Sequence, residues 1–200
     1  MKMVLYELDQ GRPWTADPDA VHPVFPTHPI TDEDFRAVDG LWRYTIIRDP
    51  IERLLSAYGN RVHHHQDIHR DVAALGWVRR FELRHTRKLS HYPTPAEFYR
   101  HLNAYQTISY SILHHTAPIT RFIGSDLSRF DAIFPVEDLG RLEHELSERT
   151  RRSIVLPRVQ TGDQKLTMDM LPRDARQAVL DHTADDYDLL QDWYTRPSQR

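Results

Sequence analysis

The chain has 200 residues and a formal net charge of −3 at pH 7, with 40% hydrophobic and 28% charged residues. This length predicts a single domain over residues 1–200 that can bury its own core. The absence of cysteine excludes disulfides, thiolate metal sites and cysteine nucleophiles, and the slightly acidic charge excludes a generally basic nucleic-acid binder. No stretch approaches the roughly 20 apolar residues of a membrane span, and the first ten residues do not resemble a signal peptide, so we expect a cytoplasmic protein.

The first part of the chain predicts an extended segment, a short helix and a strand. Residues 1–30 are expected to be an extended, proline-rich segment, because five prolines between positions 13 and 29 disfavour helix. Thr31 is a typical N-cap with three acidic residues in the turn after it, and Gly40 is a typical helix stop. Aromatic and β-branched residues then predict a buried strand over Leu41–Ile47.

The remainder of the chain alternates predicted helices with short predicted strands. A helix is expected from Pro50, and residues 62–92 are expected to form an irregular helical excursion. Further helices are expected over Thr94–Asn103, Tyr105–His114, Asp138–Arg149 and Pro172–Asp192, the last with a break near Thr183, and further strands over Ile119–Ile123, Ala132–Val136 and Ile154–Leu156. Strands separated by helices predict an α/β fold with a largely parallel sheet flanked by helices.

The most informative segment joins the first predicted strand to the helix that follows it. Asp49 at the N-cap, Pro50 at the first helical position and Glu52 three residues after the cap predict a capping box. Arg48 stands at the carboxyl end of the strand, where α/β sheets bind ligands, and its guanidinium can donate two hydrogen bonds to a phosphate. Ser56 can add a hydroxyl donor from the polar side of the helix. The alternative is that Arg48 pairs with a neighbouring acid and Ser56 only packs, and the residues alone do not decide between the two.

The string Arg48-x-Pro50-x-x-Arg53-x-x-Ser56-x-Tyr58 resembles the 3′-phosphate-binding motif of the sulfotransferases. It is most similar to that of the carbohydrate sulfotransferases and their bacterial relatives. The resemblance extends over roughly residues 27–194. It implies a P-loop nucleotide-kinase-like fold and 3′-phosphoadenosine 5′-phosphosulfate (PAPS) as the co-substrate. It also implies that Arg48 and Ser56 hold the 3′-phosphate and that Arg53 supports them.

The same resemblance implies further binding residues and a catalytic base. Residues 156–162 resemble the late loop that closes over the co-substrate, which implies that Arg158 and Lys165 bind the co-substrate. In the family, a histidine or an acid between the two phosphate motifs often serves as the base. By this resemblance His28 is the expected base and His22 is the second choice. A surface position in a loop is the alternative for both histidines.

One departure from the family pattern concerns the 5′-phosphosulfate. Sulfotransferases begin with a strand, a loop that is rich in lysine and in glycine, serine or threonine, and a helix, and this loop holds the 5′-phosphosulfate. The sequence before Arg48 contains no recognisable loop of this kind. We therefore expect either a domain that is shortened at its N-terminus or another group in place of the loop.

Histidines cluster at His63, His64, His65 and His69. On a helix His65 and His69 would share a face and could hold a metal ion, but only an aspartate at position 67 or 71 stands near enough in the sequence to complete the ligand set. A polar helix end is the other interpretation, and we expect no metal site.

These features together predict a sulfotransferase that moves a sulfuryl group from PAPS to a hydroxyl of a saccharide or related acceptor. The expected partners are the nucleotide co-substrate and a glycan acceptor, with neither nucleic acid nor a membrane span. The alternative is a non-catalytic nucleotide- or glycan-binding protein with a degenerate sulfotransferase fold. Nucleotide binding without turnover would identify that alternative.

Overall fold

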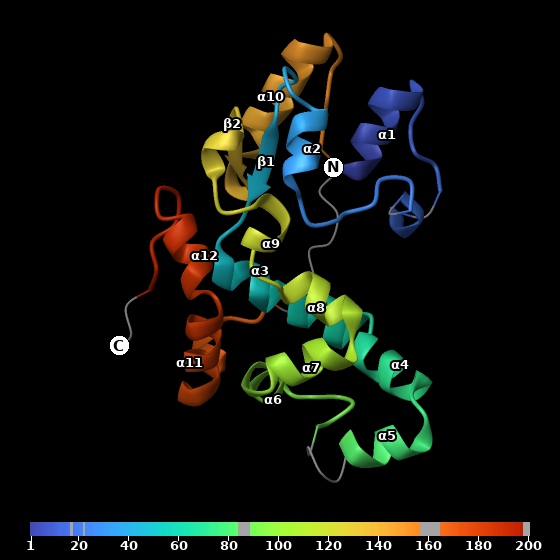
Figure 1. Ribbon diagram of the computed structural model, residues 1–200, viewed down its shortest axis with the longest axis vertical. Coiled ribbons are helices and arrows are strands. Elements are labelled where there is room, and N and C mark those ends of the chain that lie inside the picture. Colours follow the sequence, from blue (N-terminus) through green and yellow to red (C-terminus); the bar gives the residue numbers. More distant parts are fainter. Residues whose placement is uncertain (17, 22, 84–88, 157–164, 198–200) are drawn as a thin grey trace. The chain divides into compact units, whose positions relative to one another are not determined.

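The chain forms two units, each with its own hydrophobic core, in a computed structural model that describes residues 1–16, 18–21, 23–83, 89–156 and 165–197 (Figure 1). Unit 1 comprises Met1–Arg48 and Arg121–Thr161, and unit 2 comprises Asp49–Thr120 and Gly162–Arg200. Parallel strands with flanking helices confirm the expected α/β class. The P-loop-like arrangement and the single domain over residues 1–200 stay predictions.

Unit 1 is built on a two-stranded parallel sheet. Strand β1 (Tyr44–Ile47) pairs with β2 (Ala132–Pro135), in a register that sets Tyr44 opposite Ala132 and Ile47 opposite Pro135. Figure 1 shows the two strands side by side, with helix α10 (Leu139–Thr150) next to them. The core between them contains Val4, Phe134, Leu142, Leu146 and Leu156. Two of the four predicted strands are therefore confirmed, although β1 begins three residues later and β2 ends one residue earlier than expected.

Two helices precede β1 in unit 1. Helix α2 (Asp32–Ala37) begins with the expected cap, because the Thr31 and Asp34 side chains each bond to the other's backbone in a capping box. Helix α1 (Lys2–Gln10) corrects the expectation of an extended segment over residues 1–30. No proline precedes position 13, and Val4 gains burial in the core when this stretch is helical. A 3-10 turn at Pro18–Val21 further shortens the extended part.

Two other strand predictions are wrong. Helix α9 (Thr120–Ile123) replaces the strand expected over Ile119–Ile123. The backbone N–H of Ile119 donates to the Asp186 carboxylate at 2.8 Å, so it takes no part in a sheet. Residues 153–156 form no strand either, because side chains of α10 satisfy their backbone. The Ile154 N–H donates to Ser147 Oγ at 3.0 Å, and the Leu156 N–H donates to Glu143 Oε1 at 2.7 Å.

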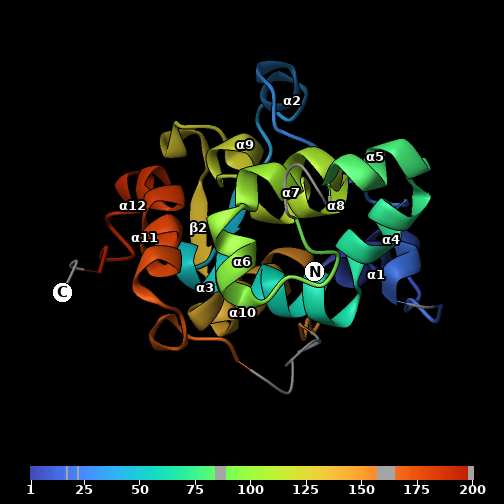
Figure 2. The same cartoon turned by 90° about the horizontal axis from the view of Figure 1, so that it is seen from below.

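In the described residues of unit 2, all of the regular elements are helices, joined by short loops. The unit contains α3 (Pro50–Ala57), a π-helical turn (Tyr58–His64), α4 (Asp67–Ala74), α5 (Trp77–Phe81), α6 (Pro95–Arg100), α7 (Leu102–Ile108), α8 (Tyr110–Thr116), α11 (Arg173–His182) and α12 (Ala184–Leu189). Helices α7 and α8 lie side by side (Figure 2), and α11 packs on α6. The buried core includes Leu54, Phe98, Tyr105, Ile112 and Val179.

The helix boundaries in unit 2 follow local signals. The expected break near Thr183 separates α11 from α12. The helix expected over Tyr105–His114 is interrupted at Ser109, which has an extended backbone and caps α8 by accepting from the Ile112 N–H. The irregular region after position 62 contains α4 and α5, as expected. No helix in the described part of the chain is long and apolar enough to cross a membrane.

Candidate functional site

The N-terminus of α3 is fixed by the carboxylate of Asp49. Asp49 Oδ1 accepts from the Glu52 N–H at 2.9 Å, and Pro50 occupies the first helical position, as the sequence predicted. The other oxygen, Oδ2, accepts from the Tyr187 hydroxyl at 2.8 Å. Burial, together with this hydrogen bond to a carboxylate, raises the pKa of Tyr187. The Asp49 carboxylate thus stabilises the first turn of α3 by its bond to the Glu52 N–H, and is itself held in place by Tyr187 of α12.

The apolar face of α3 and the exposed position of Ser56 are as the sequence pattern predicted, whereas Arg53, which the pattern placed on the polar side, is turned into the protein. Ile51, Leu54 and Leu55 are buried in the core of unit 2. Ser56 is exposed on the opposite face, so its hydroxyl is accessible to a ligand. This exposed position is what a phosphate-binding serine requires.

Arg53 lies on the same helix but is directed into the protein. Its Nη2 donates to the Ala117 carbonyl at 2.5 Å and to Asp186 Oδ2 at 3.2 Å. The Asp186 side chain is only 2% exposed, and burial raises its pKa, against the opposing charge of Arg53. Asp186 also accepts from the Ile119 N–H. The Arg53 guanidinium thus connects α3 to the segment after α8 and to α12.

Lys165 stands beside the first turn of α3. Its Nζ lies 3.0 Å from Glu52 Oε2, and both side chains are exposed enough for solvent to screen this ion pair. Lys165, Arg53 and Ser56 are therefore gathered on or next to one helix. Arg158, the other residue expected in the late loop, lies outside the described residues, as does His22.

Arg48 and His28 belong to unit 1. Arg48 directly follows β1 and is partly buried. His28 lies in the loop before α2, and its Nε2 is 3.3 Å from Asp34 Oδ1. Asp34 Oδ2 accepts from the Thr31 N–H at 2.8 Å and from the Thr31 hydroxyl at 2.7 Å. The hydrogen bonds from Thr31, and then that from His28, hold the pKa of Asp34 below its usual range. The capping box of α2 therefore orients the carboxylate that faces His28.

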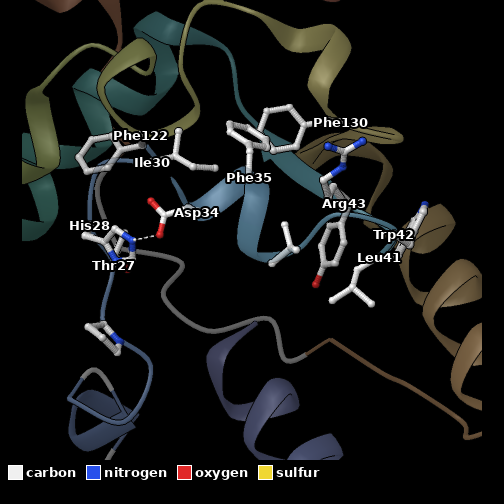
Figure 3. Close-up of a pocket in the computed structure, with 13 residues that line it drawn as sticks. Thr27, His28, Ile30, Asp34, Phe35, Leu41, Trp42, Arg43, Phe122 and Phe130 are labelled. Atoms are coloured by element: carbon white, nitrogen blue, oxygen red, sulfur yellow. Dashed lines mark hydrogen bonds and ion pairs between the residues drawn. The ribbon is translucent and has the colours of Figure 1, made fainter. Parts of the chain in front are cut away.

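Figure 3 shows a cavity beside this pair, with a volume of about 480 Å³. Thr27, His28 and Asp34 lie at one end of it, and Leu41 and Trp42 lie at the other. Most of its lining is apolar and includes Ile30, Phe35, Val38, Leu41, Trp42 and Phe122. All of its lining residues belong to unit 1. An apolar cavity with a few convergent polar groups is the usual form of a small-molecule site.

A model described as the sulfotransferase family matches residues 27–194. The chain belongs to the sulfotransferase family. The match has the same bounds as the resemblance read from the sequence. It contains all of the predicted site residues: His28, Arg48, Arg53, Ser56, Arg158 and Lys165. No curated protein and no solved structure matches the chain.

Sequence reasoning missed two features of the candidate site. It did not pair His28 with Asp34, although the spacing of Thr31 and Asp34 already indicated a capping box with a fixed carboxylate. It also missed the cavity, whose walls come from segments far apart in the sequence, such as Phe35 and Phe130. Only the folded chain brings those segments together.

In the part of the chain that the structure describes, no group of three or more side chains that could hold a metal ion is found, at the histidine cluster or elsewhere. His69 stacks on the Tyr92 ring with centroids 4.5 Å apart. Asp67, which the sequence suggested as a metal ligand, is buried and accepts from Ser111 Oγ at 2.5 Å, from Arg61 Nε at 2.7 Å and from Arg70. Its oxygens are thus occupied by side-chain donors.

Proposed function

We propose that this sulfotransferase moves the sulfuryl group of PAPS to a hydroxyl of a saccharide acceptor. Membership of the family supports sulfuryl transfer in general. The observation that carries the finer proposal is the motif at Arg48 and Ser56, because it falls where a strand ends and a capped helix begins. The similarity of this motif to that of carbohydrate sulfotransferases supports a saccharide as the acceptor.

The residues of the motif fit a phosphate group. A guanidinium can donate two parallel hydrogen bonds to phosphate oxygens, and an exposed hydroxyl can donate a third. In this proposal Arg48 and Ser56 bind the 3′-phosphate. The positive end of the α3 dipole, whose first turn Asp49 and Tyr187 hold, favours the same negative charge. When bound, PAPS supplies the sulfuryl group and leaves as 3′,5′-ADP.

The supporting residues act around α3. Arg53 holds the helix through Ala117 and Asp186 and so positions Ser56. Lys165 carries a positive charge at the first turn of α3, where its ion pair with Glu52 is weak enough to be exchanged for a phosphate oxygen. Arg158 is proposed to add a further cation from the late loop.

His28 is the proposed base. Because an ionised Asp34 can only accept, His28 Nε2 carries the proton of their shared hydrogen bond, and Nδ1 is left to accept a proton. The acceptor oxygen attacks sulfur, its proton passes to His28 Nδ1, and the bond from sulfur to the leaving phosphate oxygen breaks with its electrons on the phosphate. Proton transfer of this kind contributes about 10²–10⁴ in rate.

One observation favours a second function, that of a non-catalytic nucleotide or glycan binder. In the described residues before β1, the elements are α1, a 3-10 turn and α2, and none of them is a strand. The loop for the 5′-phosphosulfate that the family pattern leads us to expect is not recognisable in their sequence. Such a binder would retain the 3′-phosphate site and lose the chemistry.

Two measurements test the proposal. Calorimetry with 3′,5′-ADP measures nucleotide binding, and transfer of radiolabelled sulfate from PAPS to a panel of glycans and glycosides measures turnover. Binding together with turnover is the expected result. Binding without turnover on any of these acceptors would favour the second function, and failure to bind 3′,5′-ADP would contradict both.

A further inference from the structure

The unit 1 cavity has polar side chains at both of its ends, but they differ in kind. Thr27, His28 and Asp34 form one end (Figure 3). At the other end, Arg43 and Tyr44 line the cavity beside Leu41 and Trp42, and their side-chain contacts with Asp131 and Met1 are long. Arg43 Nε lies 3.6 Å from Asp131 Oδ2, and the Tyr44 hydroxyl donates to Met1 Sδ at 3.6 Å. A ligand in this cavity therefore meets Thr27, His28 and Asp34 at one end, and at the other end it meets mainly the apolar side chains of Leu41 and Trp42, with Arg43 beside them.

This division does not suit a free saccharide that fills the whole cavity. A sugar carries a hydroxyl on most of its carbons, and each hydroxyl that is buried without a partner costs free energy. A volume of about 480 Å³ suits a small organic ligand larger than one sugar ring. The apolar end would thus accept a group that has no hydroxyls.

The walls of the cavity are fixed while its mouth is open. Phe35 is buried, meets Phe130 edge to face with ring centroids 5.5 Å apart, and is covered by the Arg129 guanidinium at 3.6 Å. Leu41 and Val38, in contrast, are 63% and 36% exposed. An aromatic ring bound between them would remove their apolar surface from water at little cost in reorganisation.

We propose that the cavity binds the aglycone of a glycoside acceptor, an aromatic or hydrocarbon group, at its apolar end and places a sugar hydroxyl at His28. This inference rests on the proposed sulfuryl transfer, which it deepens by naming the acceptor class. The acceptor is then a glycoside with an apolar substituent, and free sugars or unsubstituted glycans are poor acceptors.

A matched pair of ligands tests the inference without PAPS. Calorimetry would compare 4-nitrophenyl β-D-glucopyranoside with methyl β-D-glucopyranoside, which share the sugar and differ in the aglycone. Burial of the aromatic ring predicts that the aryl glycoside binds about tenfold or more tightly. Equal affinities for the two glycosides would overturn the inference.

Two variants locate the binding. Leu41→Ser removes an apolar side chain from the lining and should reduce the preference for the aryl glycoside several-fold. Val155→Ser is the matched control, because Val155 belongs to the same unit, is 74% exposed and does not line the cavity. Thermal unfolding of both variants checks that they fold. A preference that Leu41→Ser leaves unchanged would place the aglycone elsewhere and overturn the inference.

The result is separable from that of the proposed function. An aryl preference that depends on Leu41, without turnover of PAPS, would support the cavity assignment and contradict sulfuryl transfer. Turnover on unsubstituted glycans, without a preference for the aryl glycoside, would support sulfuryl transfer and contradict the cavity assignment.

Discussion

The Tyr187 hydroxyl donates to Asp49 Oδ2 at 2.8 Å, across 138 positions of the sequence. The other oxygen of the same carboxylate caps α3 through the Glu52 N–H. A residue of α12 therefore fixes the cap of the helix that carries Ser56. This one carboxylate therefore contributes to the stability of unit 2. It also helps to position Ser56, which is proposed to donate a hydrogen bond to the 3′-phosphate.

Tyr187→Phe is expected to destabilise the protein by about 1 kcal/mol at neutral pH, since it removes one hydrogen bond. The raised pKa of Tyr187 sets the pH dependence: its neutral form is favoured in the folded state, so this contribution is complete below about pH 10 and is lost as the pH rises above that value. Urea unfolding between pH 7 and 11 measures both effects. A variant as stable as the parent at pH 7 would contradict the role given to this hydrogen bond.

Arg48→Ala is expected to lower the affinity for 3′,5′-ADP about tenfold to a hundredfold, because a charge-assisted hydrogen bond contributes about 1.5–3 kcal/mol. Ser56→Ala should have a smaller effect, since it removes a neutral donor while the arginine remains. Arg121→Ala is the control, because that arginine is exposed on the short helix α9. Calorimetry on folded variants measures the effects, and unchanged binding by Arg48→Ala would remove this residue from the site.

Arg53→Met is expected to destabilise the protein by about 3 kcal/mol, because it leaves the carboxylate of Asp186 buried without its cation. The double variant Arg53→Met with Asp186→Leu should be less destabilised than Arg53→Met alone, because no charge is then left in the interior. Denaturant unfolding of the single and double variants provides the comparison. Additive losses would show that the two side chains act independently.

Asp67→Asn is expected to weaken the stability of the protein most at neutral pH. Burial alone raises the pKa of Asp67, but the hydrogen bond from Ser111 and the charges of Arg61 and Arg70 together bring it below its usual value. The contribution of the carboxylate is therefore complete above about pH 4 and is lost as the pH falls through the lowered pKa. Between pH 7 and pH 2, the free energy of unfolding should fall less steeply with decreasing pH for Asp67→Asn than for the exposed control Asp188→Asn.

His28→Ala is expected to lower kcat/KM about 10²–10⁴-fold, which is the range for loss of a general base. The affinity for 3′,5′-ADP should stay within about twofold, because the nucleotide is assigned to other residues. His144→Ala, an exposed histidine on α10, is the matched control. Equal turnover by both variants would show that another group accepts the proton.

The sequence predicted those elements whose signals are local. The caps at Thr31 and Asp49 and the break at Thr183 each depend on residues within one turn of the helix. The strand expected over Ile119–Ile123 failed because the N–H of Ile119 is satisfied by a carboxylate 67 positions away. A contact between residues so far apart in the sequence cannot be recognised from the local composition around either of them.

Part of the candidate site could likewise be predicted from local sequence, and part of it could not. The phosphate motif is a continuous string, so Arg48 and Ser56 could be chosen from the sequence alone. The buried partners of Arg53 could not, because Ala117 and Asp186 are brought to it by the fold. The same holds for the cavity beside His28, whose walls include Phe122 and Phe130 from after position 120.

The register of the sheet limits how β1 can change. Ile47, its last residue, stands opposite Pro135, and proline has no N–H to continue the ladder. An insertion after Ile47 would therefore lengthen the connection that begins at Arg48 and would leave the strand at four residues. Each added residue would move the Arg48 guanidinium away from the end of the strand.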